Sequence, residues 1–309
     1  MFSEKLKSLR KQAKLSQEQL AEQLHVSRQA VTKWETDAGV PEIGNLRAIS
    51  ALFRISLDEL LENETTAQPR PDFLFESVTE YDVDCKKSFD LSLTGSKKII
   101  LSGYDGEKLR VRLASDELPE IQSAFKVKID DVRQRLDVDI HCCGGMTETE
   151  ARKKLTLMIE IPTQYTMNVE LAGNTESLDV RGTAAENIEF SGKVKRVAIL
   201  DSEGHIELNT NEDTDILWDG FTGRLDLNQI SATSRLRLPA GMEFCAAVRG
   251  IANHLLYRKN GETAEDFSLK GEAAGNCSNL IELNGMKSEL TIDAGPVGTA
   301  PAGDAGGAE

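Results

Sequence analysis

The sequence predicts a two-part protein, in which an all-α N-terminal domain is followed by an all-β region. Up to about residue 63, apolar residues recur with the 3.6-residue period of amphipathic helices. From about residue 73 they alternate with polar residues at a period of two, as in half-buried strands. The stretch between these parts, residues 64–72, is polar, lacks apolar periodicity and includes Pro69 and Pro71, so we expect a linker there.

The first domain is expected to span residues 1–63 and to contain five short helices. Helix one is predicted over 3–14, helices two and three within 15–35, and helix four over 42–53. Helix five is expected to begin at Ser56, where Ser-Leu-Asp-Glu has the spacing of a capping box. The apolar stripes of these helices together form one small core.

Two short helices joined by a tight turn are the most informative feature of this domain. Ser16 and Gln19 have the spacing of a capping box, and Ser27 is placed to cap the following helix. His25 and Val26 form the turn, where a residue with φ > 0 is expected. Two N-caps around a short turn are typical of a helix-turn-helix motif.

The second helix of this pair divides by chemistry when each residue is placed about 100° on from the last. Four polar residues share one arc of roughly 140°: Arg28, Gln29, Thr32 and Lys33. Three apolar residues share another, of roughly 100°: Ala30, Val31 and Trp34. The apolar face is expected to pack, with Trp34 as a core anchor. The polar groups match base-pair edges in a major groove, although a solvated helix face is the alternative interpretation.

Residues 1–63 resemble the lambda-repressor-like family of bacterial regulators, also called the XRE family. The resemblance rests on LSQEQLAEQL, VSRQAVTKWE, DAGVPEIGNL and ISLDELL, which cover about a fifth of the chain. It departs at His25, where many members carry glycine. The family implies a transcription regulator that binds double-stranded DNA, and repression is its commoner mode of action.

The resemblance also implies which side chains contact DNA. Eight residues are expected to do so: Gln17, Ser27, Arg28, Gln29, Thr32, Lys33, Asn45 and Arg47. Base contacts are implied at Arg28, Gln29 and Lys33, and a phosphate contact at Gln17. The residues Ser27 and Asn45 lie at helix starts, where backbone N–H groups can bind phosphates.

The charge distribution agrees with this assignment. The chain carries a formal net charge of −15, but residues 1–65 hold nine basic and ten acidic residues and so account for only −1. Residues 1–35 alone carry seven basic and four acidic residues. Basic groups are thus concentrated where DNA is expected, and the acidic remainder is explained by solubility or by repulsion of DNA.

The second part, residues 73–293, is predicted to be all-β, and its centre has a weak repeat. Seven short strands follow one another with first apolar residues nine to eleven positions apart: Leu178, Ile188, Val197, Ile206, Ile216, Leu225 and Leu236. A meander, a sandwich or a β-solenoid would produce such spacing, and the even steps with Gly, Asn or Asp corners favour a solenoid. This stretch resembles bacterial adhesin-like repeat domains of unknown function, which implies a fold and no activity.

Few other segments suggest chemistry. His141, Cys142 and Cys143 are adjacent and could hold a metal or form a redox site, but the Cys-x-x-Cys spacing common in metal sites is absent from the sequence. The other three cysteines, Cys85, Cys245 and Cys277, are expected to be isolated, buried packing residues, and a disulfide framework is not expected. The sequence has no recognisable catalytic motif, so we expect neither an enzyme nor a cofactor.

The Gly-, Ala- and Pro-rich segment 294–309 is expected to be disordered.

These features predict a cytoplasmic DNA-binding regulator, because the sequence lacks an evident signal peptide or membrane span. A homodimer is expected, with the β region mediating self-association or sensing an unknown effector. The alternative is a β-solenoid binding or structural scaffold that carries a DNA-tethering module. A glycan-acting enzyme built on the solenoid is a third possibility.

Overall fold

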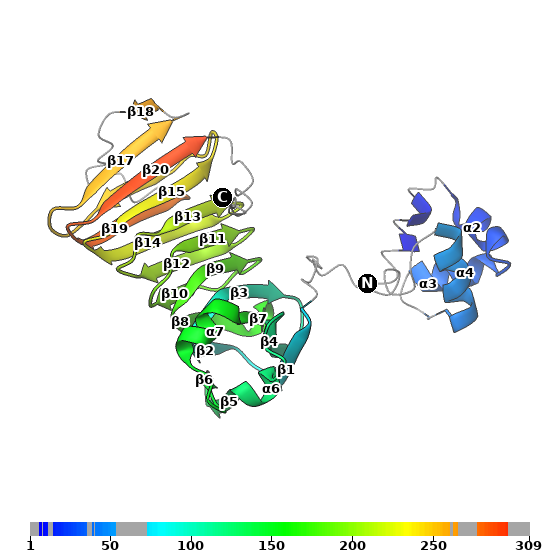
Figure 1. Ribbon diagram of the computed structural model, residues 1–309. Coiled ribbons are helices and arrows are strands. Elements are labelled where there is room, and N and C mark those ends of the chain that lie inside the picture. The colour runs from blue at the N-terminus through cyan, green and yellow to red at the C-terminus, as the bar shows by residue number, and fades with distance from the viewer. Residues whose placement is uncertain are drawn as a thin grey trace, which may run out of the picture. The chain divides into compact units, whose positions relative to one another are not determined.

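The computed structural model describes residues 6–7, 9–11, 15–35, 39, 41–53, 73–259, 262–264 and 277–295. The chain divides into two compact units, Met1–Pro71 and Asp72–Glu309. The described part of the first unit is helical, and the described part of the second is built mainly of strands (Figure 1). No helix among the described residues is long and apolar enough to span a membrane.

The first unit packs its helices around one apolar cluster. Residues 6, 7 and 9–11 are helical, and three further helices follow: α2 (Gln17–Gln23), α3 (Arg28–Glu35) and α4 (Ile43–Phe53). Eight buried side chains form the core: Leu6, Leu20, Ala21, Leu24, Val31, Trp34, Leu46 and Ile49. The expected fifth helix falls within residues 54–72, outside the described residues, so the number of helices remains a prediction.

The second unit contains two sheets. The larger has 11 described strands in the order β1 (Phe75–Asp82), β4 (Lys108–Ser115), β7 (Thr156–Pro162), β3 (Ser96–Tyr104), β9 (Thr175–Arg181), β11 (Arg196–Leu200), β13 (Asp215–Asp219), β15 (Thr233–Pro239), β20 (Glu289–Gly295), β17 (His254–Lys259) and β18 (Glu262–Ala264). The smaller has nine in the order β16 (Cys245–Val248), β19 (Leu280–Met286), β14 (Thr222–Ile230), β12 (Glu203–Asn209), β10 (Asn187–Ser191), β8 (Thr166–Ala172), β2 (Lys87–Ser92), β6 (Arg135–Cys142) and β5 (Phe125–Val132).

From β8 to β15 successive strands alternate between the two sheets, and each strand from β8 to β13 pairs in parallel with the strand two places on. The seven predicted short strands are found as β9 to β15. Their first apolar residues are buried and stack in two columns, Leu178–Val197–Ile216–Leu236 in the larger sheet and Ile188–Ile206–Leu225 in the smaller. Alternation in sequence therefore becomes a continuous core between the sheets.

The first strands of this unit are connected differently. The pairs β1–β4, β4–β7 and β5–β6 are antiparallel. Two short α-helices, α6 (Ile121–Ala124) and α7 (Glu148–Lys154), and the 3₁₀ turn η1 (Thr163–Tyr165) interrupt the strands. The sequence reading missed α7, although Thr147 and Glu150 form its capping box; the helix is only seven residues long and carries no repeated apolar stripe.

The cysteine prediction is wrong in two respects. Cys245 and Cys277 form a disulfide across 32 residues of sequence, with 6.0 Å between their Cα atoms. Pairing of β16 with β19 sets Cys245 opposite Leu280, which brings Cys277, three residues earlier, within disulfide reach. Cys85 is exposed rather than buried. Sequence alone could not reveal either result, because both depend on which strands are neighbours.

Candidate nucleic-acid interface

The two helix starts and the turn between them have the predicted local geometry. The Ser16 hydroxyl accepts from the Gln19 backbone N–H at 3.1 Å, and the Gln19 carboxamide oxygen accepts from the Ser16 N–H at 2.8 Å. The Ser27 hydroxyl accepts from the Ala30 N–H at 3.2 Å. His25 has a φ of 56°, which confirms the left-handed turn position. These short-range contacts fix how α3 leaves α2.

The helix α3 presents the predicted polar face to solvent. Its exposed side chains include all four expected on that arc: Arg28, Gln29, Thr32 and Lys33. On the other face Val31 is fully buried and Trp34 is 6% exposed. The residues predicted to contact bases therefore share one exposed surface of α3, and buried Val31 and Trp34 anchor the opposite face of the helix.

A buried ion pair joins the first helical segment to the end of α3. The Arg10 Nε and Nη2 atoms donate to the two carboxylate oxygens of Glu35 at 2.6 and 2.9 Å. The Glu35 side chain is 2% exposed and that of Arg10 is 13% exposed. Arg10 also donates to the Leu15 carbonyl at 2.9 Å. This bidentate contact orients α3 against the N-terminal helical segment.

Gln17 takes part in the same network. Its Nε2 atom donates to Glu35 at 2.8 Å, and its Oε1 atom accepts from the Thr32 hydroxyl at 3.3 Å. The Thr32 hydroxyl also lies 3.0 Å from the Arg28 carbonyl oxygen. Two residues predicted to contact DNA thus contact each other, and part of their hydrogen-bonding capacity is used inside the protein. Sequence analysis did not reveal this network, since Gln17 is 15 positions from Thr32 and 18 from Glu35.

The charge state of Glu35 follows from these contacts. Burial raises the pKa of its carboxyl, but the hydrogen bonds from Arg10 and Gln17 and the charges of Arg10 and Lys7 outweigh burial, so the pKa lies below its ordinary value. The hydrogen bond to Glu35 raises the pKa of Arg10. Both groups are therefore ionised near neutral pH.

The remaining predicted contacts lie on or beside the helices. Asn45 is half-buried in the first turn of α4, and Arg47 is exposed one residue beyond Leu46 of the core. Ser27 is exposed, and its hydroxyl is occupied as the cap of α3. The DNA contacts of all eight residues stay predictions.

Sequence comparison supplies the family. The helix-turn-helix profile matches residues 6–60. The transcriptional activator BcrR of Enterococcus faecalis is 52% identical over 63 residues, which cover 20% of this chain and only 31% of BcrR. The uncharacterised transcriptional regulator YqaE of Bacillus subtilis is 30% identical over 139 residues, covering 45% of this chain and 99% of YqaE. The chain belongs to the helix-turn-helix family of transcriptional regulators.

The β region of this helix-turn-helix regulator is weakly similar to solved structures. A candidate cell adhesion protein from Clostridium sporogenes matches 72% of the chain with a TM-score of 0.35 and 12% identity, and all of that structure is covered. A candidate adhesin from Bacteroides fragilis matches 72% with a TM-score of 0.32 and 11% identity, with 97% of that structure covered. Similarity at this level says nothing about what the β region binds.

The His141–Cys143 segment has no metal-site geometry. His141 is exposed, and Cys142 lies with its Sγ 3.1 Å from the Thr94 hydroxyl. Both cysteines are free thiols. Across the part of the chain that the structure describes, no group of three or more His, Cys, Asp or Glu side chains could hold a metal ion.

Proposed function

We propose that this regulator binds an operator sequence-specifically through α3. The observation that carries the proposal is the arc of four exposed polar side chains on α3, held in place by buried Val31 and Trp34. A recognition helix of this kind enters the major groove with its first turn nearest the bases. Arg28 and Gln29 occupy that first turn. Their planar donor groups are suited to guanine and adenine edges respectively.

The network around Glu35 supports a division of labour in this proposal. Arg10 and Glu35 fix the position of α3, while Arg28, Gln29 and Lys33 project from it. Gln17, Ser27, Asn45 and Arg47 are assigned to the phosphate backbone, which sets register without reading sequence.

We further propose that the regulator acts as a homodimer in the cytoplasm and that its β region is a solenoid that mediates self-association or senses an effector. Two half-sites one helical turn apart require paired recognition helices. The parallel alternation of β8 to β15 between two sheets supports the solenoid form. We expect the regulator to repress transcription. Because BcrR is named as an activator, the reporter assay should be able to detect both a decrease and an increase in transcription.

Footprinting on the DNA upstream of the chain's own gene tests the DNA-binding proposal. The full chain should protect one or two short segments, and Arg28→Ala should abolish protection at the same concentration. Arg196→Ala is the matched control, because Arg196 is an exposed arginine on β11 of the other unit. Protection that survives Arg28→Ala, or no protection by the wild-type chain, would count against the proposal. Sedimentation of the full chain at micromolar concentration tests the dimer.

A further inference from the structure

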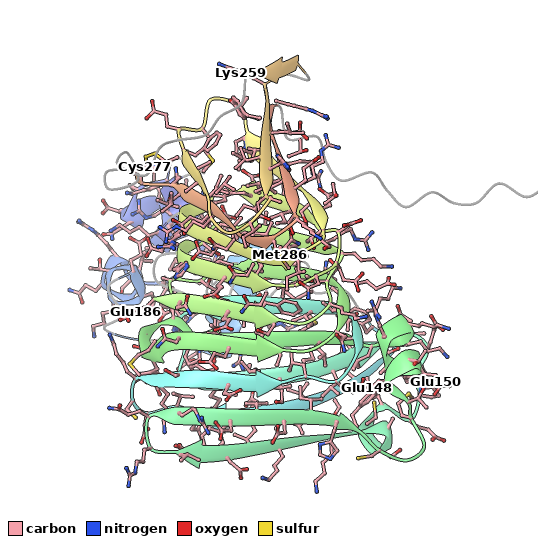
Figure 2. The ribbon with its side chains drawn as sticks, turned by 90° about the vertical axis from the view of Figure 1, so that its left-hand side faces the viewer. Glu148, Glu150, Glu186, Lys259, Cys277 and Met286 are labelled. Atoms are coloured by element: carbon pink, nitrogen blue, oxygen red, sulfur yellow. A yellow bond between two sulfur atoms is a disulfide. The ribbon has the colours of Figure 1, made fainter. Side chains whose placement is uncertain are left out.

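A groove whose lining residues are mostly of polar type lies in the β region, where strands of the smaller sheet end. It has a volume of about 710 Å³, and its lining comes from β12, β14 and β19 and from the turns that follow β8, β10 and β12. Six of its lining residues carry carboxamides: Asn174, Asn209, Asn211, Asn228, Gln229 and Asn284. Figure 2 labels Met286, which directly follows the lining residue Gly285.

One wall of the groove is an asparagine ladder. Asn209, Asn228 and Asn284 lie opposite one another on β12, β14 and β19. The Asn284 Nδ2 atom donates to Asn228 Oδ1 at 3.0 Å, and Asn228 Nδ2 donates to Asn209 Oδ1 at 2.6 Å. Carboxylates on the same face of the sheet fix these amides: Glu207 accepts from Asn228 at 2.6 Å and Glu189 from Asn209 at 2.7 Å. The wall is therefore ordered before any ligand arrives.

Two of the lining residues are glycines that lie close to the neighbouring backbone. Gly192 and Gly285 have φ of 147° and 120°, and a Cβ atom on either would lie 1.8 Å from the carbonyl oxygen of the preceding coil. No other residue fits such a close backbone approach. Gln229, between them, is 1% exposed and is held by the Glu212 carbonyl at 3.1 Å and the Ser234 hydroxyl at 2.9 Å.

Two further lining amides, those of Asn174 and Asn211, offer open donors. The Asn174 Oδ1 atom accepts from the Lys193 N–H at 3.2 Å, and Asn211 Oδ1 accepts from the Ile230 N–H at 2.9 Å. No described group accepts a hydrogen bond from the NH₂ group of either residue, so both can bind a ligand. Ile230, 51% exposed, adds an apolar surface, and Met286, 39% exposed, pairs with it on the next strand.

We propose that this groove binds a linear, uncharged oligosaccharide. Carboxamides both donate and accept, as hydroxyl-rich ligands require, and the apolar surface of Ile230 and Met286 can pack against the C–H face of a pyranose ring. The two charged lining residues, Lys193 and Glu212, pair with each other at 3.5 Å, so the lining itself has no net formal charge.

The spacing of the wall favours sugar over polypeptide. The amides repeat with the strands, about 4.8 Å apart, which is close to the length of one equatorially 1→4-linked pyranose unit. An extended peptide advances about 3.3 Å per residue and falls out of step with the ladder. Sugar binding in this groove does not depend on DNA binding. Only a role of the bound sugar as an effector of the regulator rests on the proposed function.

Calorimetric titration of the full chain tests the groove. The probes are cellotetraose and chitotetraose, with maltotetraose as the axially linked control and an uncharged extended octapeptide of alternating Ser and Asn. The key variant is Asn174→Asp combined with Asn211→Asp, which keeps the oxygens that accept from the Lys193 and Ile230 N–H groups and replaces each open NH₂ donor with a carboxylate oxygen. Asp213→Asn is the matched control, because Asp213 caps Thr233 N–H at 2.7 Å beside the groove without lining it.

At least one equatorially linked tetrasaccharide should bind more tightly than maltotetraose. The double variant should weaken this binding by roughly tenfold, and Asp213→Asn should leave it within about twofold, with unchanged Trp218 fluorescence in both variants. No binding of either tetrasaccharide at millimolar concentration overturns the proposal, as does binding of the octapeptide alone. Sugar binding unaffected by the double variant would also overturn it, because the sugar would then lie elsewhere. DNA binding, measured separately, is unaffected by any of these outcomes.

Discussion

Replacing Glu35 by glutamine removes the charge on which the first unit's buried network is built. The glutamine has nearly the same shape, but Arg10, 13% exposed in the ion pair, would keep its charge without a carboxylate partner. Breaking a buried pair from one side costs about 3–5 kcal/mol, and the residual exposure of Arg10 argues for the lower end. For a domain of this size, about 3 kcal/mol corresponds to a fall in Tm on the order of 15 °C.

Trp34 provides the assay, since Trp34 and Trp218 are the only two tryptophans of the chain and lie in different units. Thermal unfolding followed by fluorescence in a Trp218→Phe background should show the lowered Tm for Glu35→Gln. Arg10→Met combined with Glu35→Leu should recover most of it, because no unpaired charge then remains. A Tm within about 3 °C of wild type for Glu35→Gln would refute the assigned cost of the lost pair.

The same pair predicts a pH dependence. The pKa of Glu35 is lower in the folded chain than its ordinary value, so its stabilising contribution is complete above the ordinary, unfolded-state pKa and is lost as pH falls through the folded value. Wild-type unit one should therefore lose stability in acid more steeply than the Arg10→Met/Glu35→Leu variant. Parallel acid titrations of the two chains would contradict this assignment.

Three further predictions use simpler measurements. His25→Gly should raise the free energy of unfolding of the first unit by about 0.3–1 kcal/mol, because a positive φ suits glycine. His25→Val should lower it by about 1–2 kcal/mol, because a β-branched residue is strained there. Unfolding followed by Trp34 fluorescence measures both changes. Alkylation of the unreduced, denatured chain should label three cysteines and spare Cys245 and Cys277, and five labelled cysteines would contradict the disulfide. Limited proteolysis should cut first within residues 63–72, and resistance there would contradict a linker.

The parts of the fold that sequence could predict depend on neighbours in the chain. Ser16, Gln19 and Ser27 act within three residues of themselves, and the turn at His25 is set by its own backbone. Likewise the strands β9 to β15 follow from a period of two that each segment carries by itself. These features can be predicted from the sequence because they do not depend on contacts with residues far away in the chain.

The features that sequence missed depend on distant partners. Gln17 is joined to Glu35 across 18 residues and Cys245 to Cys277 across 32, and no local pattern encodes either contact. The groove at Asn209, Asn228 and Asn284 likewise exists only because parallel pairing aligns residues 19 and 56 positions apart. Helix α7 is a different case, since the capping box at Thr147 and Glu150 was present in the sequence but the apolar period was not.

The central claim, that α3 reads base sequence, is tested most directly by comparing the affinity of Arg28→Ala for the footprinted operator and for a scrambled duplex at several salt concentrations. A bidentate arginine–guanine contact contributes about 1–3 kcal/mol of discrimination, so the variant should lose roughly tenfold or more for the operator and much less for the scrambled duplex. Gln17→Ala, assigned to the backbone, should weaken both duplexes evenly. An equal loss for both duplexes with Arg28→Ala would mean that Arg28 binds phosphate and does not read the bases.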